Sequence, residues 1–183
     1  RMLYSCEVYT HLRSCDVQPE NLITIMGPSK TEPLSGFRLG VAFGTPKLIK
    51  RMECLQAIVS LRAAGYNQAA LDTWFQEPLG WMENRIREHE LIRDELLKTF
   101  RASNIYTASP QAGSYLFPQL PPLSVDLYTF IHLLRHQAKV IVTPGSEFDP
   151  ACKDSIRLNF SQDYSAAIAA AKRIVKMVDI YRT

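Results

Sequence analysis

The sequence predicts a mixed α/β chain in two parts, residues 1–95 and residues 96–183. Two short apolar runs near the beginning, bounded by polar residues or glycine, predict buried strands, and amphipathic helices follow them. After Ser103 the elements become shorter and prolines more frequent, in the order strand, strand, helix, strand, strand, helix. That order is typical of a compact α+β unit. We expect the boundary inside a long helix, near residue 95.

Local signals place the elements of the first part. Thr45 and Pro46 suit the N-cap and the first turn of a helix, and Gly65 begins a break after it. Apolar residues at helical spacing predict that the next long helix lies along a surface. The expected elements are strands at residues 22–26 and 37–43, and helices at residues 46–62, 68–76 and 81–100.

The second part shows the same kinds of signal in shorter elements. Ser124 suits the cap of an amphipathic helix, and Asp163 opens a closing helix with apolar residues on one face. The expected elements are strands at residues 105–108, 114–117, 140–143 and 155–160, and helices at residues 124–138 and 163–181.

The composition is that of a globular chain with its own core. Of 183 residues, 46% are hydrophobic and 21% are charged. The net charge is +3 with both signs interspersed, so we expect no nucleic-acid partner. No apolar run reaches the ~20 residues of a membrane helix, and no signal peptide is visible, so we expect a cytoplasmic protein without a membrane partner. The four cysteines are far apart, which argues against a zinc site or a disulfide framework.

The loop after the first strand holds the main candidate for chemistry. Gly27 and Pro28 give it a tight, stiff backbone, and Lys30 supplies an amine that, when neutral, can attack a carbonyl to form a Schiff base. Ser29 and Arg38 add a hydroxyl and a fixed cation of the kind that binds phosphate. The alternative is that Lys30 is an ordinary solvated lysine, as most lysines after a strand are.

Arg157 is the second candidate. It lies between Ile156 and Leu158 in an otherwise apolar strand, where an unpaired charge would be costly. We therefore expect a carboxylate partner, either from the protein or from a ligand, and the sequence leaves both open.

Other motifs carry weaker signals. The turn at residues 144–148 could wall a ligand pocket or could be an ordinary turn. His132 and His136 stand four residues apart on a helix, but no acidic residue joins them, and we expect no metal site. Cys54 and Cys152 have no base beside them in the sequence, so we expect no thiol nucleophile.

Five motifs, taken in order, resemble the class I/II aminotransferases, the pyridoxal-phosphate enzymes of the aspartate aminotransferase fold, also called fold type I. The resemblance implies that residues 1–95 are the C-terminal portion of the large cofactor-binding domain and that residues 96–183 are the small C-terminal domain. The motifs are Gly27-Pro-Ser-Lys30, Ser35-Gly-Phe-Arg38-Leu-Gly40, Gly113-Ser-Tyr-Leu-Phe117, Val142-Thr-Pro-Gly-Ser146 and Ile156-Arg157-Leu158.

The resemblance also implies roles for four residues. Lys30 corresponds to the lysine that holds pyridoxal 5'-phosphate as a Schiff base and later moves a proton. Ser29 and Arg38 fall among the positions that bind the cofactor phosphate, and Arg157 matches the arginine that binds the substrate α-carboxylate. The implied activity is transfer of an amino group from an amino acid to a 2-oxo acid, in a homodimer in which Tyr66 and Asn67 face the neighbour's cofactor.

The sequence departs from the family pattern at three positions. Gly27 stands where the family usually has a serine, which removes a hydroxyl from the phosphate cup. Glu32 and Asp149 are acidic where an apolar residue and a glycine are more usual, which would favour a cationic substrate such as arginine. Relatives that oxidise or hydroxylate arginine share the fold, so a pyridoxal-phosphate oxidase, hydroxylase or lyase is the alternative function.

Two parts of the family's cofactor site cannot be identified in the sequence. These are the aromatic residue that stacks on the pyridine ring and the aspartate that pairs with its nitrogen. We therefore expect that the missing N-terminal half of the same protein, or a second polypeptide, completes each site. A catalytically silent fragment that acts only in assembly is the further alternative.

Overall fold

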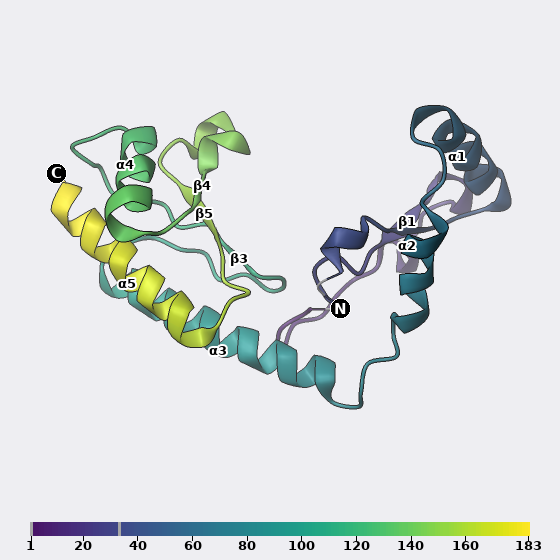
Figure 1. Cartoon of the computed structure of the whole chain (residues 1–183), viewed down its shortest axis with the longest axis horizontal. Coiled ribbons are helices and arrows are strands. Elements are labelled where there is room, and N and C mark those ends of the chain that lie inside the picture. Colours follow the sequence, from purple (N-terminus) through teal and green to yellow (C-terminus); the bar gives the residue numbers. More distant parts are fainter. Residues whose placement is uncertain (1, 33) are drawn as a thin grey trace. The chain divides into compact units, whose positions relative to one another are not determined.

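The computed structural model describes residues 2–32 and 34–183, and the contacts divide the chain into two units, Arg1–Met82 and Glu83–Thr183 (Figure 1). No helix among the described residues is long and apolar enough to cross a membrane.

The first unit is built around a small antiparallel sheet. Strand β1 (Thr24–Met26) pairs with β2 (Val41–Phe43), with Ile25 opposite Ala42. Helix α1 (Pro46–Val59) follows β2, and α2 (Gly65–Ala69) comes after it. Short 3-10 helices complete the unit, at Leu12–Ser14, Pro19–Asn21, Ser35–Phe37 and Ala70–Thr73.

The first strand and the start of α1 are confirmed, whereas two other predictions for this unit are wrong. The second strand begins only at Val41, because the chain first makes a 3-10 turn that ends at Arg38 in the left-handed region, with φ of 51°. The helix expected at 68–76 begins instead at Gly65, and it passes into a 3-10 turn that ends before Trp74. Thr45 occupies the N-cap of α1, but its side chain makes no capping hydrogen bond.

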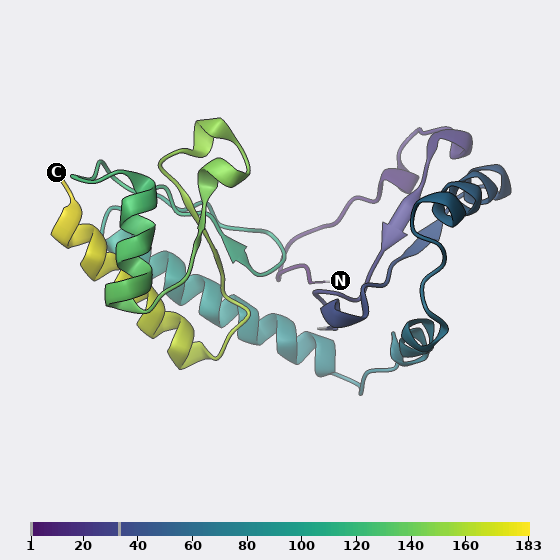
Figure 2. The same ribbon diagram turned by 45° about the horizontal axis from the view of Figure 1, so that its top comes forward.

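The second unit packs helices against a three-stranded antiparallel sheet in the order β3-β5-β4. The two views in Figures 1 and 2 place α3 and α5 on the same side of this sheet. Its largest fully buried side chains include Phe100, Phe130 and Phe160. The elements are α3 (Trp81–Ala102), β3 (Tyr115–Leu116), α4 (Leu127–Leu133), a π-helical turn (Leu134–Ala138), β4 (Thr143–Pro144), β5 (Ile156–Asn159) and α5 (Tyr164–Tyr181).

Helix α3 belongs with the second unit over most of its length. Its buried face includes His89, Ile92 and Leu96. The His89 Nε2 atom lies 3.0 Å from the hydroxyl of Ser161, which follows β5. The division therefore falls after Met82, at the beginning of the helix, whereas the sequence placed it near residue 95. The assignment of the parts as large and small domains remains a prediction.

The predicted strand at 155–160 and the closing helix are confirmed, and three other expectations for the second unit are corrected. Residues 105–108 form no strand; Tyr106 makes only an isolated bridge with Gln119. The strand expected at 140–143 begins three residues later and is only two residues long, at Thr143–Pro144. Helix α4 is capped by Asp126 rather than by Ser124, whose hydroxyl donates to the Tyr181 carbonyl oxygen instead.

The cap of α4 also explains a lowered pKa, that of Asp126. The Asp126 carboxylate accepts hydrogen bonds from the hydroxyl of Thr129, at 2.6 Å, and from its backbone N–H, at 3.1 Å. Both bonds favour the charged form and hold the pKa of Asp126 below its usual value.

Candidate active site

The lysine loop connects the two strands of the first unit. β1 ends at Met26, and the chain then turns so that Lys30 is exposed and Ser29 is half-buried. Pro28 is fully buried, and its carbonyl oxygen accepts hydrogen bonds from the backbone N–H groups of Glu32, at 3.2 Å, and of Leu34, at 3.3 Å. The buried proline and these two bonds fix the backbone from which the Lys30 amine projects.

Close backbone approach explains the glycine before this turn. A Cβ on Gly27 would lie 3.1 Å from the carbonyl oxygen of Leu39, so a serine there would push against the chain that leads into β2. The glycine that the sequence analysis noted as a departure from the family pattern therefore fits the local packing.

Arg38 lies on the same loop as Lys30. Its guanidinium is exposed, and Nη1 donates a hydrogen bond to the Ser35 carbonyl oxygen at 3.2 Å. The loop thus offers an amine, the Ser29 hydroxyl and a guanidinium, all on the short connection between β1 and β2. This donor set suits an anionic group bound beside a reactive carbonyl.

The two acidic residues that the sequence placed near the site both take part in local structure. Glu32 is only 9% exposed and accepts a hydrogen bond from the Thr31 hydroxyl. Asp149 accepts a hydrogen bond from the backbone N–H of Ala151 at 2.7 Å and so caps a short 3-10 turn. Each carboxylate already has a partner within its own loop, which weakens the expectation of a cationic substrate.

Arg157 lies in the second unit, on the central strand of its sheet. In β5 it pairs with Thr143 of β4, and it alternates with the fully buried Ile156. Side chains of successive strand residues point to opposite faces, so Arg157 lies on the face opposite the one that Ile156 turns to the core. Its side chain is half-buried.

Aromatic rings, not carboxylates, surround this guanidinium. Its Cζ lies 4.8 Å from the centroid of the Tyr115 ring and 4.4 Å from that of Phe148. No ion pair involves Arg157 within residues 2–32 and 34–183. Of the two alternatives that the sequence left open, a protein carboxylate partner is thus absent from the described chain. A ligand carboxylate remains the open alternative.

The turn at residues 144–148 positions Phe148. The backbone N–H of Gly145 donates to the Ser155 carbonyl oxygen at 2.7 Å, and the N–H of Phe148 donates to Gly145 at 2.9 Å. A Cβ on Gly145 would lie 2.4 Å from the Cys152 carbonyl oxygen, so only glycine fits. The Phe117 ring meets that of Phe148 edge to face, at 5.9 Å between centroids.

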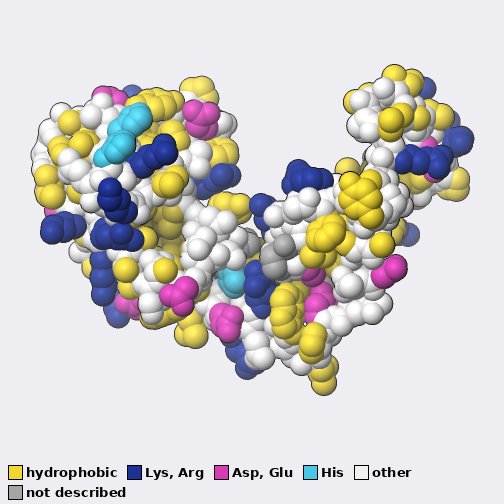
Figure 3. Space-filling model, in the orientation of Figure 1, with side chains coloured by type: hydrophobic (Ala, Val, Ile, Leu, Met, Phe, Trp, Pro, Cys, Tyr) yellow, Lys and Arg dark blue, Asp and Glu magenta, His cyan; other side chains and the backbone are white. Residues whose placement is uncertain are grey.

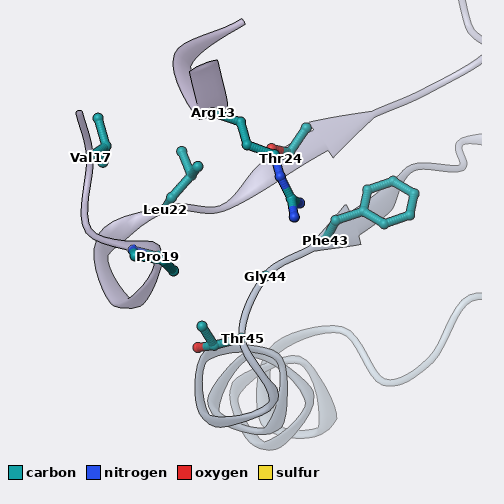
Figure 4. Close-up of a pocket in the computed structure, with 8 residues that line it drawn as sticks. All are labelled: Arg13, Val17, Pro19, Leu22, Thr24, Phe43, Gly44 and Thr45. Carbon is teal, nitrogen blue, oxygen red and sulfur yellow. The ribbon is translucent and has the colours of Figure 1, made fainter. Parts of the chain in front are cut away.

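The pockets of the first unit do not coincide with the predicted site. A pocket of about 270 Å³ lies at the other end of the hairpin, next to the start of α1. Figure 4 shows the Arg13 guanidinium pointing into it between Thr24 and Phe43. In the second unit, a pocket of about 360 Å³ is lined mainly by α5, by the end of β5 and by residues 139–141. Neither pocket is lined by Lys30, Ser29, Arg38 or Arg157.

Three of the four predicted residues thus lie on one loop. Lys30, Ser29 and Arg38 share one loop of the first unit, and Arg157 belongs to the second unit. Sequence reasoning missed the rings of Tyr115 and Phe148 beside Arg157. Both rings lie within motifs that it singled out. The contact of Tyr115 with Arg157 depends on pairing between strands about forty residues apart in the chain, and that of Phe148 depends on the turn after β4.

Comparison with known proteins gives one consistent result. The family model described as aminotransferase class I and II matches residues 3–174. The chain is 26% identical to "Aromatic-amino-acid aminotransferase 2" of Thermococcus litoralis and 26% identical to "Aspartate aminotransferase" of Pyrococcus abyssi, in each case over 97% of this chain and 49% of the relative.

A solved structure agrees with these relatives. The crystal structure of an aspartate aminotransferase from Rhodobacter sphaeroides is 60% identical, with a TM-score of 0.95, over 99% of this chain and 46% of that one. The predicted fold class, an α/β part of a fold type I domain, is confirmed. The chain spans about half the length of the relatives it matches.

Proposed function

We propose a function from the premise that this chain belongs to the class I and II aminotransferase family. The function is pyridoxal-phosphate-dependent transfer of an amino group from an amino acid to a 2-oxo acid. The observation that carries the proposal is the family match over residues 3–174, which contains both the lysine loop and the strand of Arg157. The other proposed functions, oxidation or elimination, find no support among the relatives named above, which are all aminotransferases.

The lysine loop fits the aldehyde and the phosphate of the cofactor. The Lys30 amine is exposed at the strand end and would hold the cofactor covalently through its Nζ atom. The Ser29 hydroxyl and the Arg38 guanidinium, on the same loop, would bind the phosphate oxygens. Bound there, pyridoxal phosphate supplies an electron sink for the bond broken at the amino-acid Cα atom.

Two residues of the chain have further parts in the proposed reaction. Once the substrate amine has displaced it from the cofactor, the freed Lys30 amine would take the proton from the substrate Cα atom and return it at the carbon of the cofactor that receives the amino group. The Arg157 guanidinium would hold the α-carboxylate of the amino acid and then that of the 2-oxo acid, because both substrates carry this group. We propose aspartate as the first amino donor to test, since the relative that is 60% identical is named an aspartate aminotransferase.

The proposal includes further polypeptide around the first unit. Ile25 of β1 is 70% exposed, and α1 has no buried residue. Figure 3 shows hydrophobic side chains gathered on the surface of the part that contains α1. Exposed apolar surface of this kind is typical of a face that another chain segment covers. The missing N-terminal half of the protein would provide this cover. We also propose a homodimer, because the family is usually dimeric, and a cytoplasmic location.

The test of the lysine assignment is chemical trapping. Pyridoxal 5'-phosphate is added to the 183-residue chain, the imine is reduced with borohydride, and the labelled lysine is located by peptide mass spectrometry. We expect Lys30 to be labelled at lower cofactor concentration than Lys47, an exposed lysine of the same unit. Lys30→Ala should abolish this labelling, and Lys47→Ala should leave it intact. Equal labelling of the two lysines would contradict the assignment.

The reaction type is tested in the same preparation. Aspartate and 2-oxoglutarate are added, and glutamate formation and dioxygen consumption are followed together. Transamination predicts glutamate without loss of dioxygen, and an oxidase predicts the reverse. Labelling of Lys30 with neither product would favour a cofactor-binding fragment that needs its missing half for turnover.

A further inference from the structure

The surroundings of Arg157 are unusual for a half-buried charge. Two aromatic rings lie within 4.8 Å and 4.4 Å of its Cζ atom, and within the described part of the chain it has no carboxylate partner. A charge on an otherwise apolar strand needs compensation, and the face of an aromatic ring supplies part of it through its quadrupole.

The geometry of a guanidinium determines which of its hydrogen-bond donors stay available for a ligand. Its N–H groups all lie in the plane of the group, and aromatic rings stack on its faces. A ring that stacks on a face of the group leaves these in-plane donors free for a planar acceptor with two oxygens. A carboxylate is such an acceptor, and it binds a guanidinium through two parallel hydrogen bonds.

Each ring is held by its own part of the fold. Tyr115 is paired with Asn159 on the neighbouring strand, diagonal to Arg157 on the same face of the sheet. Phe148 is held by the turn that begins at Gly145 and by the edge of the Phe117 ring. The two rings therefore reach the guanidinium from separate elements, β3 and the turn after β4.

We infer that Tyr115 and Phe148 are positioning residues, which hold the Arg157 guanidinium by cation–π contacts so that its in-plane N–H groups face a substrate carboxylate. The inference rests on the proposed function in one respect, namely that the carboxylate is the α-carboxylate of an amino acid. A purely structural role for the rings would stabilise the sheet without changing how Arg157 binds an anion.

The test follows the Arg157 side chain itself, by NMR on the ¹⁵N-labelled 183-residue chain. The Nε–Hε signal of Arg157 is identified by its loss in Arg157→Lys. We expect ring currents from the two aromatic rings to move this signal upfield of the other arginines. Tyr115→Leu and Phe148→Leu should each move it back, while Tyr115→Phe and Phe148→Tyr should keep it.

Carboxylate binding is then measured on the same signal. Succinate is the probe, because it has no amine and cannot react with the cofactor, and chloride at matched ionic strength is its control. Loss of one ring should raise the succinate dissociation constant about two- to fivefold. This factor corresponds to the free energy of an exposed cation–π contact. The control variant is Tyr164→Leu, at an exposed tyrosine at the start of α5, which should change neither the shift nor the affinity.

The outcomes separate this inference from the proposed function. An Arg157 signal without a ring-current shift would overturn the inference, as would unchanged succinate affinity in both leucine variants or no succinate binding by the unmodified chain. Should Phe148→Leu lose its fold, Tyr115→Leu decides alone. If the affinity falls as expected but Lys30 is not labelled by the cofactor, the inference stands and the proposed function fails.

Discussion

The two units of the chain differ in how much of their apolar surface they bury. Among the described hydrophobic residues that are buried, the first unit contributes only Met2, Tyr4, Leu39 and Trp74, and all others belong to the second unit. Helix α5 buries Ile174 and Val178 almost completely, whereas Ile58 on α1 is 82% exposed.

This difference shows that an apolar stretch of helix forms a core only where the chain provides a surface to receive it. Both α1 and α5 begin where the sequence predicted, so local signals are sufficient for the helices. Burial requires the sheet and the neighbouring helices, which the second unit contains. The second unit therefore has the core of an independent domain, whereas the first unit leaves most of its described apolar side chains exposed.

The largest expected effect is the loss of stability when a core side chain is truncated. Phe130 is 0% exposed, and its ring meets Tyr181 edge to face, so Phe130→Ala should lower the free energy of unfolding by about 3–5 kcal/mol. Ile58→Ala on α1 should change it by less than about 0.5 kcal/mol. Urea unfolding followed by far-UV circular dichroism measures both. Similar losses in the two variants would contradict the comparison, because they would show that α1 is packed in solution.

A smaller effect is expected at two glycines that lie in the loops of the candidate site. A methyl group on Gly145 would lie 2.4 Å from the Cys152 carbonyl oxygen and 2.8 Å from that of Ser155. Gly145→Ala should therefore cost about 1–3 kcal/mol of unfolding free energy. Around Gly36, in the Arg38 loop, no atom lies within 4 Å of such a methyl group, and Gly36→Ala should cost nothing. A stable Gly145→Ala variant would show that the turn carrying Phe148 is less tightly packed than described.

The smallest effect concerns pH and the buried histidine of the second unit. Burial lowers the pKa of His89 below its usual value of 6.5. Its Nδ1–H donates a hydrogen bond to the Arg85 carbonyl oxygen, and its Nε2 accepts one from the Ser161 hydroxyl. The unfolded state then takes up a proton more readily than the folded state. The stability due to neutral His89 is therefore fully present above about pH 6.5 and is lost as the pH falls below it.

Urea unfolding at a series of pH values measures this dependence. His89→Gln should flatten the fall in unfolding free energy below about pH 6.5. The control is His132→Gln, at an exposed histidine on α4, which should leave the His89-dependent part unchanged. The same slope in His89→Gln as in the unmodified chain would show that another group causes it.

Sequence reasoning predicted those parts of the fold whose signals are local. Pro46 at the start of α1, Asp163 at the cap of α5 and the apolar run of β5 all act within a few residues. The family match supports the resemblance inferred from the motifs that contain Lys30 and Arg157. The roles of these two residues remain proposals. Two failures in the second unit occurred where a distant partner decides. Tyr106, in the strand expected at 105–108, makes only one bridge, with Gln119, and α4 is capped by Asp126 while Ser124 bonds to Tyr181.

The sequence by itself determined which residue types stand in the lysine loop and that a charged residue interrupts the apolar strand at Arg157. Only the tertiary structure decided that Tyr115 and Phe148, rather than a carboxylate of the described chain, meet that charge. The physical reason is the distance along the chain over which each interaction acts. Periodicity and capping act between near neighbours, whereas the contacts of Arg157 form when strand pairing and a tight turn bring three separate segments together.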